Sequence, residues 1–123
     1  MPEAIRYLSS LLPGGWPEIM SRNRALALDA RRRVCAALSI PPPCPDDMIG
    51  SMATIPIAGG ADRPRNSAFE IDLLQQELLD RFRIEVPIDP WLISSMRLLR
   101  LSAQLYNRSE DYHVLAEALK ELL

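Results

Sequence analysis

Side chains that commonly carry catalysis or bind metal ions are scarce in this sequence. Its 123 residues include one histidine, His113, one lysine, Lys120, and two cysteines. One histidine without a cluster of other ligands excludes the usual zinc sites, and two cysteines are too few for a disulfide framework. Cys35 and Cys44 are therefore expected to be free thiols in a reducing compartment, although the sequence leaves a bridge between them open.

Long hydrophobic runs and an excess of one charge are also absent from the sequence. The net charge is −2, with 48% hydrophobic and 24% charged residues, which is the composition of an ordinary globular domain. No apolar run approaches the length of a membrane span, and no basic segment precedes an apolar one as in a signal peptide. We therefore expect no nucleic-acid partner, no membrane partner and a cytoplasmic location.

Hydrophobic spacing predicts four helices and three strands. Helices are expected over 2–12, from 16 to about 39, from a capping box at 67–70 to Phe82, and from a cap at Ser109 to the C-terminal end. Strands are expected over 51–57, 84–88 and 98–103.

This order of elements indicates an α+β (α/β) fold. We expect a two-layer sandwich with a small, mostly antiparallel sheet of about three strands and with helices on one face. A chain of this length can bury a core of its own. The second face of the sheet would have no cover, and such a face usually needs a partner.

Arg100 is the strongest candidate for a functional residue. Strand alternation places Leu99, Leu101 and Ala103 on one face of the third strand, and Arg100 on the other face with Leu98 and Ser102. A guanidinium in an apolar strand is costly unless it meets an anion. Its planar fork suits a carboxylate of a ligand, and the alternative is a structural ion pair with Glu85 or Asp89.

The other candidates have simpler interpretations. Arg97 is expected to be a surface charge, and Tyr106 and Asn107 are expected to form a turn. His113 is expected on the surface of the last helix. The arginines at 31–33 fall partly away from the apolar stripe of the long helix and are expected on a solvated face.

The segment 96–112 contains the pattern R-L-S-x-x-x-Y-N-x-x-x-D-Y, which resembles the C-terminal end of class V aminotransferases. These are pyridoxal-phosphate enzymes of fold type I. Segments 14–16, 23–31, 51–57 and 82–88 resemble successive parts of the same region. The similarity is strongest to the isopenicillin N epimerase-like branch, in which the arginine strand continues into a Gln-Leu-Tyr-Asn run.

The resemblance implies a division of the chain and a role for Arg100. Residues 1–15 would be a helical segment from the interdomain connection, and residues 16–123 would be the C-terminal small domain. Arg100 would receive the α-carboxylate of the substrate. In the family, a preceding large domain holds the Schiff-base lysine and the phosphate site. Lys120, near a helix end, is no plausible cofactor lysine, so neither cofactor nor catalysis is expected of these residues alone.

Two functions of different classes follow. The first is the small domain of a pyridoxal-phosphate-dependent amino-acid epimerase (an isomerase) or aminotransferase (a transferase). Its partners would be a large cofactor-binding domain and an amino-acid substrate, and the protein is expected to be a homo-oligomer. The second is a standalone α+β module that binds a small ligand or a protein through the uncovered face of its sheet.

Overall fold

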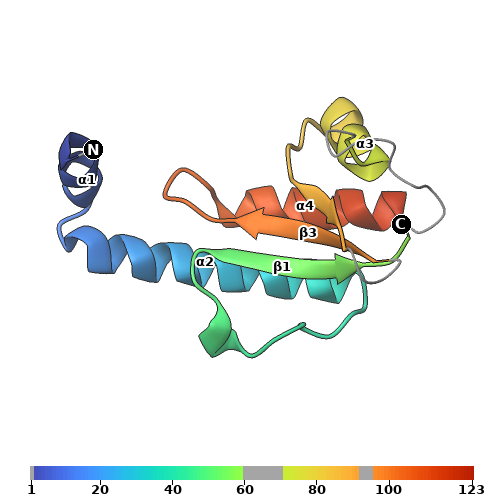
Figure 1. The fold of residues 1–123 in the computed structure, drawn as a ribbon, viewed down its shortest axis with the longest axis horizontal. Helices are drawn as coiled ribbons and strands as arrows, with labels where there is room; N and C mark the ends of the chain where they lie inside the picture. Colours follow the sequence, from blue (N-terminus) through green and yellow to red (C-terminus); the bar gives the residue numbers. More distant parts are fainter. Residues whose placement is uncertain (1, 60–70, 92–95) are drawn as a thin grey trace.

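The computed structural model describes residues 2–59, 71–91 and 96–123 (Figure 1). Its elements, in chain order, are α1 (Pro2–Ser9), α2 (Gly15–Ala37), the short 3-10 helix η1 (Asp46–Met48), β1 (Met52–Ile57), α3 (Leu73–Phe82), β2 (Ile88–Pro90), β3 (Arg97–Ser102) and α4 (Ser109–Leu122). The predicted fold class is confirmed, because the described elements form a small α+β domain with an open antiparallel sheet.

β3 is the central strand of the sheet, between β1 and β2, and pairs antiparallel with both. The predicted alternation along β3 is confirmed. Leu99 and Leu101 are at most 1% exposed, while Arg100 and Ser102 are exposed. The register places Arg100 opposite Thr54 of β1. The sheet therefore has one face that is built into the core and one that carries Arg100.

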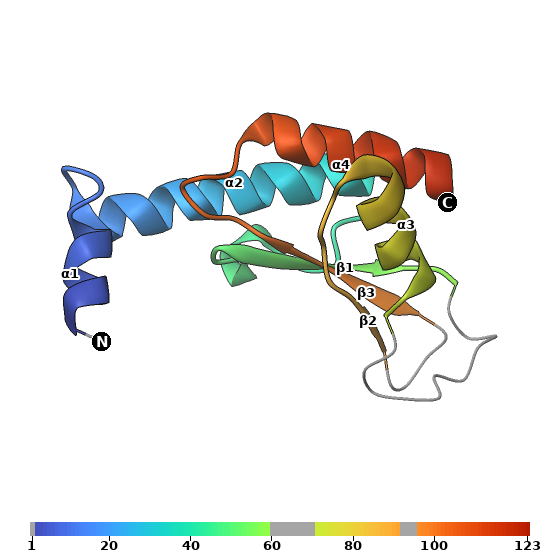
Figure 2. The same ribbon diagram turned by 90° about the horizontal axis from the view of Figure 1, so that it is seen from above.

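The two longest helices, α2 and α4, cover the core face of the sheet and pack against each other (Figure 2). Their buried residues join the inward side chains of the strands in one hydrophobic core. In α4 the side chains of Tyr112, Leu115 and Leu119 form a buried stripe and are at most 6% exposed. No helix in the described ranges is long and apolar enough to cross a membrane.

The predicted helix over 2–12 is shorter in the structure, because α1 ends at Ser9. The hydroxyls of Ser9 and Ser10 donate hydrogen bonds to the carbonyl oxygens of Arg6 and Tyr7, at 2.9 and 2.7 Å. Such local bonds compete with helix propagation. The chain then turns into α2 through Gly15, whose φ of +58° suits glycine.

Two other predicted boundaries moved. The capping box at 67–70 lies outside the described residues, and the described helix α3 starts at Leu73, with the Asp72 side chain accepting a hydrogen bond from the Leu74 N–H at 2.9 Å. The strand expected over 84–88 pairs with β3 only from Ile88 to Pro90. Pro87, which has no N–H to donate, lies at the point where the ladder stops.

The start of α4 differs from the prediction that Ser109 caps it. Arg108 precedes the first turn, and its backbone N–H donates to Asp111 Oδ2 at 2.9 Å. Ser109 instead donates its hydroxyl hydrogen to Asp29 Oδ2 of α2 at 2.6 Å. The hydrogen bond from Arg33 Nε, at 2.7 Å, and then this bond from Ser109 hold the pKa of Asp29 below its usual value. The serine therefore joins two helices.

The expectation that residues 31–33 all lie on a solvated face is wrong for Arg31, which is 0% exposed. Its guanidinium donates to the carbonyl oxygen of Cys44 at 2.8 Å and forms an ion pair with Asp46. Arg24, two helical turns earlier, donates to the carbonyl oxygens of Ile49 and Asp46, at 2.9 and 2.8 Å. The two arginines thus fasten the loop before β1 to α2.

Candidate functional site

Arg100 lies on the open face of the sheet, in the central strand. Its backbone N–H donates to the carbonyl oxygen of Pro87 at 3.0 Å, and its strand is held from the other side by β1. The strand that carries Arg100 is therefore paired on both edges. Alternation along β3 places the exposed Arg100 side chain on the face opposite the buried Leu99 and Leu101.

The alternative of a structural ion pair for Arg100 finds no support in the described residues. There, the Arg100 guanidinium has no ion pair or hydrogen bond with Glu85 or Asp89, both of which are exposed. Asp89 is opposite Leu98 in the register and shares the open face with Arg100. The guanidinium is thus available to an anion that approaches this face, and it can hold a carboxylate with two parallel N–H donors.

Arg97 has the opposite environment and is not the surface charge that the sequence predicts. Its side chain is 13% exposed and forms an ion pair with Asp72 at 2.9 Å. Its second terminal nitrogen donates to the carbonyl oxygen of Ala58, also at 2.9 Å. Arg97 thus joins the end of β1 to the start of α3. Of the two arginines in β3, Arg97 is structural and Arg100 faces the open side.

The turn between β3 and α4 is fixed by a network of side-chain amides. The Gln104 N–H donates to Asn107 Oδ1, and the Asn107 N–H donates to the Gln104 carbonyl oxygen, both at 2.9 Å. The predicted turn role of Asn107 is therefore confirmed. Gln104 Oε1 also accepts a hydrogen bond from Nδ2 of the buried Asn23 at 2.9 Å. Tyr106, at the tip of the turn, is 81% exposed.

Sequence reasoning assigned no role to Asn23, although a signal was present. Asn23 is the one polar residue in the apolar stripe of the long helix, and a buried amide needs a partner. Its partner, Gln104, is 81 residues away in sequence. Periodicity can predict that the side chain is buried, but it cannot identify so distant a partner.

Tyr112 fixes the other side of this region. Its hydroxyl donates to the carbonyl oxygen of Ser102 at 2.6 Å, which ties α4 to the end of β3. Burial raises the pKa of the Tyr112 hydroxyl above its usual value, and the charge of Asp111 adds to this effect. The final residue of the D-Y pair in the sequence pattern is therefore a buried structural residue.

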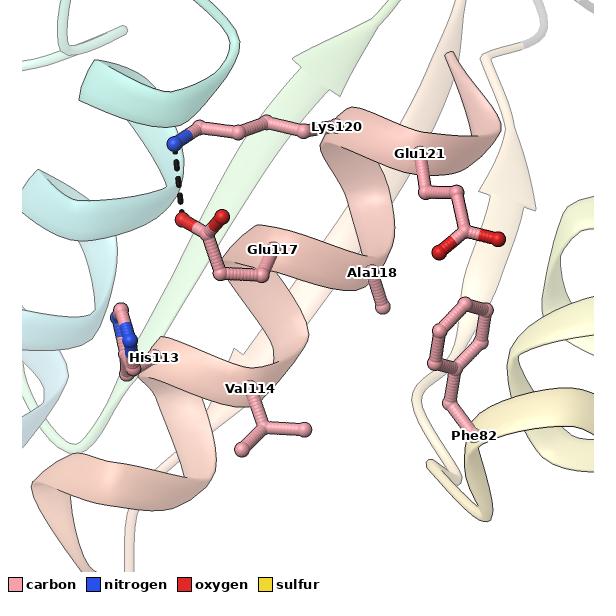
Figure 3. A pocket seen from close by; sticks show the side chains of 7 residues that line it. All are labelled: Phe82, His113, Val114, Glu117, Ala118, Lys120 and Glu121. Atoms are coloured by element: carbon pink, nitrogen blue, oxygen red, sulfur yellow. Dashed lines mark hydrogen bonds and ion pairs between the residues drawn. The ribbon is translucent and has the colours of Figure 1, made fainter.

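Lys120 does not have the surroundings of a cofactor lysine. A hollow of about 560 Å³ lies between α3 and α4, and Lys120 is one of its lining residues (Figure 3). The Lys120 ammonium is 2.8 Å from Glu117 Oε1, at a half-exposed position of the helix surface. His113, one helical turn before Glu117, is exposed as predicted. No other lysine exists in the chain, so its residues do not fit the covalent attachment of pyridoxal phosphate.

Metal ions have no candidate site in the described ranges, where no group of three or more histidine, cysteine or acidic side chains is placed to hold one. Both cysteines are free thiols, Cys35 buried and Cys44 partly exposed. Arg100 therefore stays the candidate ligand-binding residue in the described part of the chain.

Comparison with known proteins supports the resemblance that the sequence pattern predicts. No protein-family model matches the chain. The chain is 29% identical over 131 aligned residues to a probable chloroplastic L-cysteine desulfhydrase of Arabidopsis thaliana, and all of it is covered. It is 32% identical over 124 aligned residues to isopenicillin N epimerase of Amycolatopsis lactamdurans, with 99% covered.

The chain spans about a quarter of the length of these relatives, 26% of the first and 28% of the second, and aligns with their C-terminal parts. The cytoplasmic location stays a prediction, since one relative is named as chloroplastic. The predicted resemblance is confirmed: the chain is similar to the C-terminal parts of two class V aminotransferase-like, pyridoxal-phosphate-dependent proteins.

Proposed function

We propose that this chain is the C-terminal small domain of a pyridoxal-phosphate-dependent enzyme that acts on an amino acid, and that Arg100 binds the α-carboxylate of the substrate. The observation that carries the proposal is the position of Arg100. It is exposed on the open face of the central strand, and its guanidinium has no protein partner among the described residues.

The contribution of these residues is binding and orientation. The guanidinium offers two parallel donors to a carboxylate, and the fixed backbone of β3 limits where that carboxylate can lie. Pyridoxal phosphate would be held by a larger domain in another part of the protein, over which this domain closes. In this proposal residues 1–15 connect the two parts.

An arginine that binds the substrate carboxylate does not determine the type of reaction. Epimerisation and transamination both need the amino acid held by its carboxylate, and the relatives' names include an epimerase and a desulfhydrase. The chain itself would supply substrate binding in any of these reactions, and we expect it to have no activity without the larger domain.

The test uses the cofactor-loaded whole protein that contains this chain. Arg100→Gln removes the charged donors and is expected to raise the KM for the amino acid about ten- to hundredfold, because a hydrogen bond to a charged group contributes about 1.5–3 kcal/mol. Arg100→Lys keeps the charge without the planar fork and should give an intermediate value.

Arg32→Gln is the matched control, because Arg32 is an exposed arginine on the opposite side of the domain, in α2. We expect its KM to equal that of the wild type. A KM for Arg100→Gln that equals the wild-type value, in a protein that folds and binds cofactor normally, would contradict the role of Arg100.

The second candidate function is a standalone binding module, and it is favoured by the open sheet face itself. A continuous upstream reading frame that encodes a lysine-bearing domain would support the enzyme. A gene without such a region would support the module.

A further inference from the structure

The open face of the sheet holds an apolar hollow directly beside Arg100. The hollow has a volume of about 430 Å³. Its lining residues come from β1, β3 and the segments that flank them, and they are Pro43, Thr54, Pro56, Trp91, Met96 and Leu98. This volume lies within the range of pockets that bind small molecules.

The strand register shows how close this hollow is to the guanidinium. Leu98 and Arg100 point to the same face of β3 and are two residues, or about 7 Å, apart along the strand. Thr54 lies opposite Arg100, and Pro56 lies opposite Leu98. The lining residue Thr54 is thus the direct cross-strand neighbour of Arg100.

The wall of the hollow away from Arg100 is made by two large side chains. Trp91 is 48% exposed and Met96 is 40% exposed, so apolar surface of both remains open to solvent. The Trp91 N–H donates to the Met96 carbonyl oxygen at 2.9 Å, which holds these two residues together. Burial of such surface by an apolar group is favourable.

Two charged residues share the open face of the sheet with the hollow. The cation of Arg100 lies next to Thr54, and the exposed carboxylate of Asp89, in β2, lies beside the apolar Leu98 on the same face. A second negative charge on a ligand would therefore be repelled from the apolar region, while one carboxylate at Arg100 is attracted. The arrangement matches a monocarboxylate with an uncharged apolar group.

We propose that Arg100 and this hollow form one site, and that the substrate is an amino acid with a large apolar side chain. The carboxylate binds Arg100 and the side chain lies over Leu98 between Trp91 and Met96. This inference rests on the proposed function, because it assumes the carboxylate role of Arg100. It adds that the same sheet face selects the side chain.

The test measures binding of simple carboxylates to the 123-residue chain by NMR titration of its backbone amides. The probes are 3-phenylpropionate, which carries a carboxylate and a separate aromatic ring, and propionate, which lacks the ring. We expect 3-phenylpropionate to shift signals of β1 and β3 and to bind at least about tenfold more tightly than propionate.

Four variants separate the two parts of the site. Arg100→Gln should weaken both probes about tenfold or more, whereas Arg32→Gln should leave both unchanged. Leu98→Thr should remove the advantage of the phenyl group and leave the affinity for propionate unchanged. Met96→Ser, at an exposed side chain, should act in the same direction if Leu98→Thr fails to fold.

The outcomes distinguish this inference from the proposed function. If Arg100→Gln weakens both probes but the phenyl group brings no advantage, the apolar half of the site is overturned and the carboxylate role stands. If neither probe depends on Arg100, both proposals are overturned.

Discussion

Arg31 and Arg100 show that residue type alone does not decide whether an arginine is structural. Arg31 lies in a run of three arginines, yet its side chain is fully buried and bonded to the loop before β1. Arg100 lies in an apolar strand, yet it is exposed. The deciding fact is which neighbour supplies an acceptor, and that neighbour is set by the tertiary fold.

The Arg31 ion pair predicts a difference between two adjacent aspartates. Asp46→Ala leaves the buried guanidinium without its carboxylate, and we expect the free energy of unfolding to fall by about 1.5–3 kcal/mol. Asp47→Ala changes an exposed neighbour in the same 3-10 helix and should stay within about 0.5 kcal/mol of the wild type. Chemical denaturation of both variants measures this, and equal losses would contradict a specific role for the pair.

The sequence predicted the side of residues 98–102 in β3 but not the environment of Arg97. Strand alternation is local, so the inward Leu99 and the outward Arg100 followed from a period of two. Arg97 shares the inward side with Leu99, but its burial depends on Asp72, the residue just before α3 and 25 positions away. No local pattern could identify that partner.

At the scale of elements, hydrophobic periodicity located the helices and strands, and local backbone and side-chain interactions set their ends. α2 ends at Ala37, two residues before the expected end, and α1 ends early at its serine pair. The predicted strand at 84–88 has the expected burial at Val86 and Ile88, but most of it lacks a ladder. Burial and strand pairing are separate properties, and only burial follows from alternation.

The buried Tyr112 hydroxyl between α4 and β3 predicts a loss of stability at alkaline pH. The pKa of Tyr112 is raised by burial above the value near 10 of the unfolded chain, so folding favours its protonated form. The stability from this effect is complete below pH 10 and is lost as the pH rises from 10 through the higher folded-state pKa. Tyr112→Phe cannot lose a proton there, so its stability relative to wild type should improve above pH 10.

Chemical denaturation between pH 8 and pH 11.5 measures this dependence. Tyr7→Phe is the control, because Tyr7 is 66% exposed and should show the same alkaline loss as the wild type. If wild type and Tyr112→Phe lose stability in parallel above pH 10, the buried hydroxyl is not responsible.

At the scale of the whole molecule, the N-terminal end is the part that is least integrated into the core. α1 has no buried residue over its described length, and Figure 1 shows it beside the start of α2, away from the sheet. Ile5 is 55% exposed, Tyr7 is 66% exposed and Met20 is 65% exposed. This end of the molecule therefore offers apolar surface to a partner.

We expect the 123-residue chain to self-associate through this end when the larger domain is absent. Light scattering over a range of concentrations should show a mass that rises with concentration. Ile5→Asp combined with Met20→Ser should reduce the association, and Leu73→Ser, at an exposed position of α3, should not. A monomer at the highest concentration would contradict the expectation.

The domain has an open sheet face, Arg100 on that face has no protein partner in the described part, and the two relatives are about four times as long as the chain. From these features we propose that Arg100 holds the carboxylate of an amino acid in a pyridoxal-phosphate enzyme. The direct measurement is the dissociation constant of the amino acid that the wild-type whole protein converts best, from changes in cofactor absorbance in the wild type and Arg100→Gln. The account predicts a constant about ten- to hundredfold higher in the variant, with the absorbance of the ligand-free cofactor unchanged. An unchanged dissociation constant would contradict it.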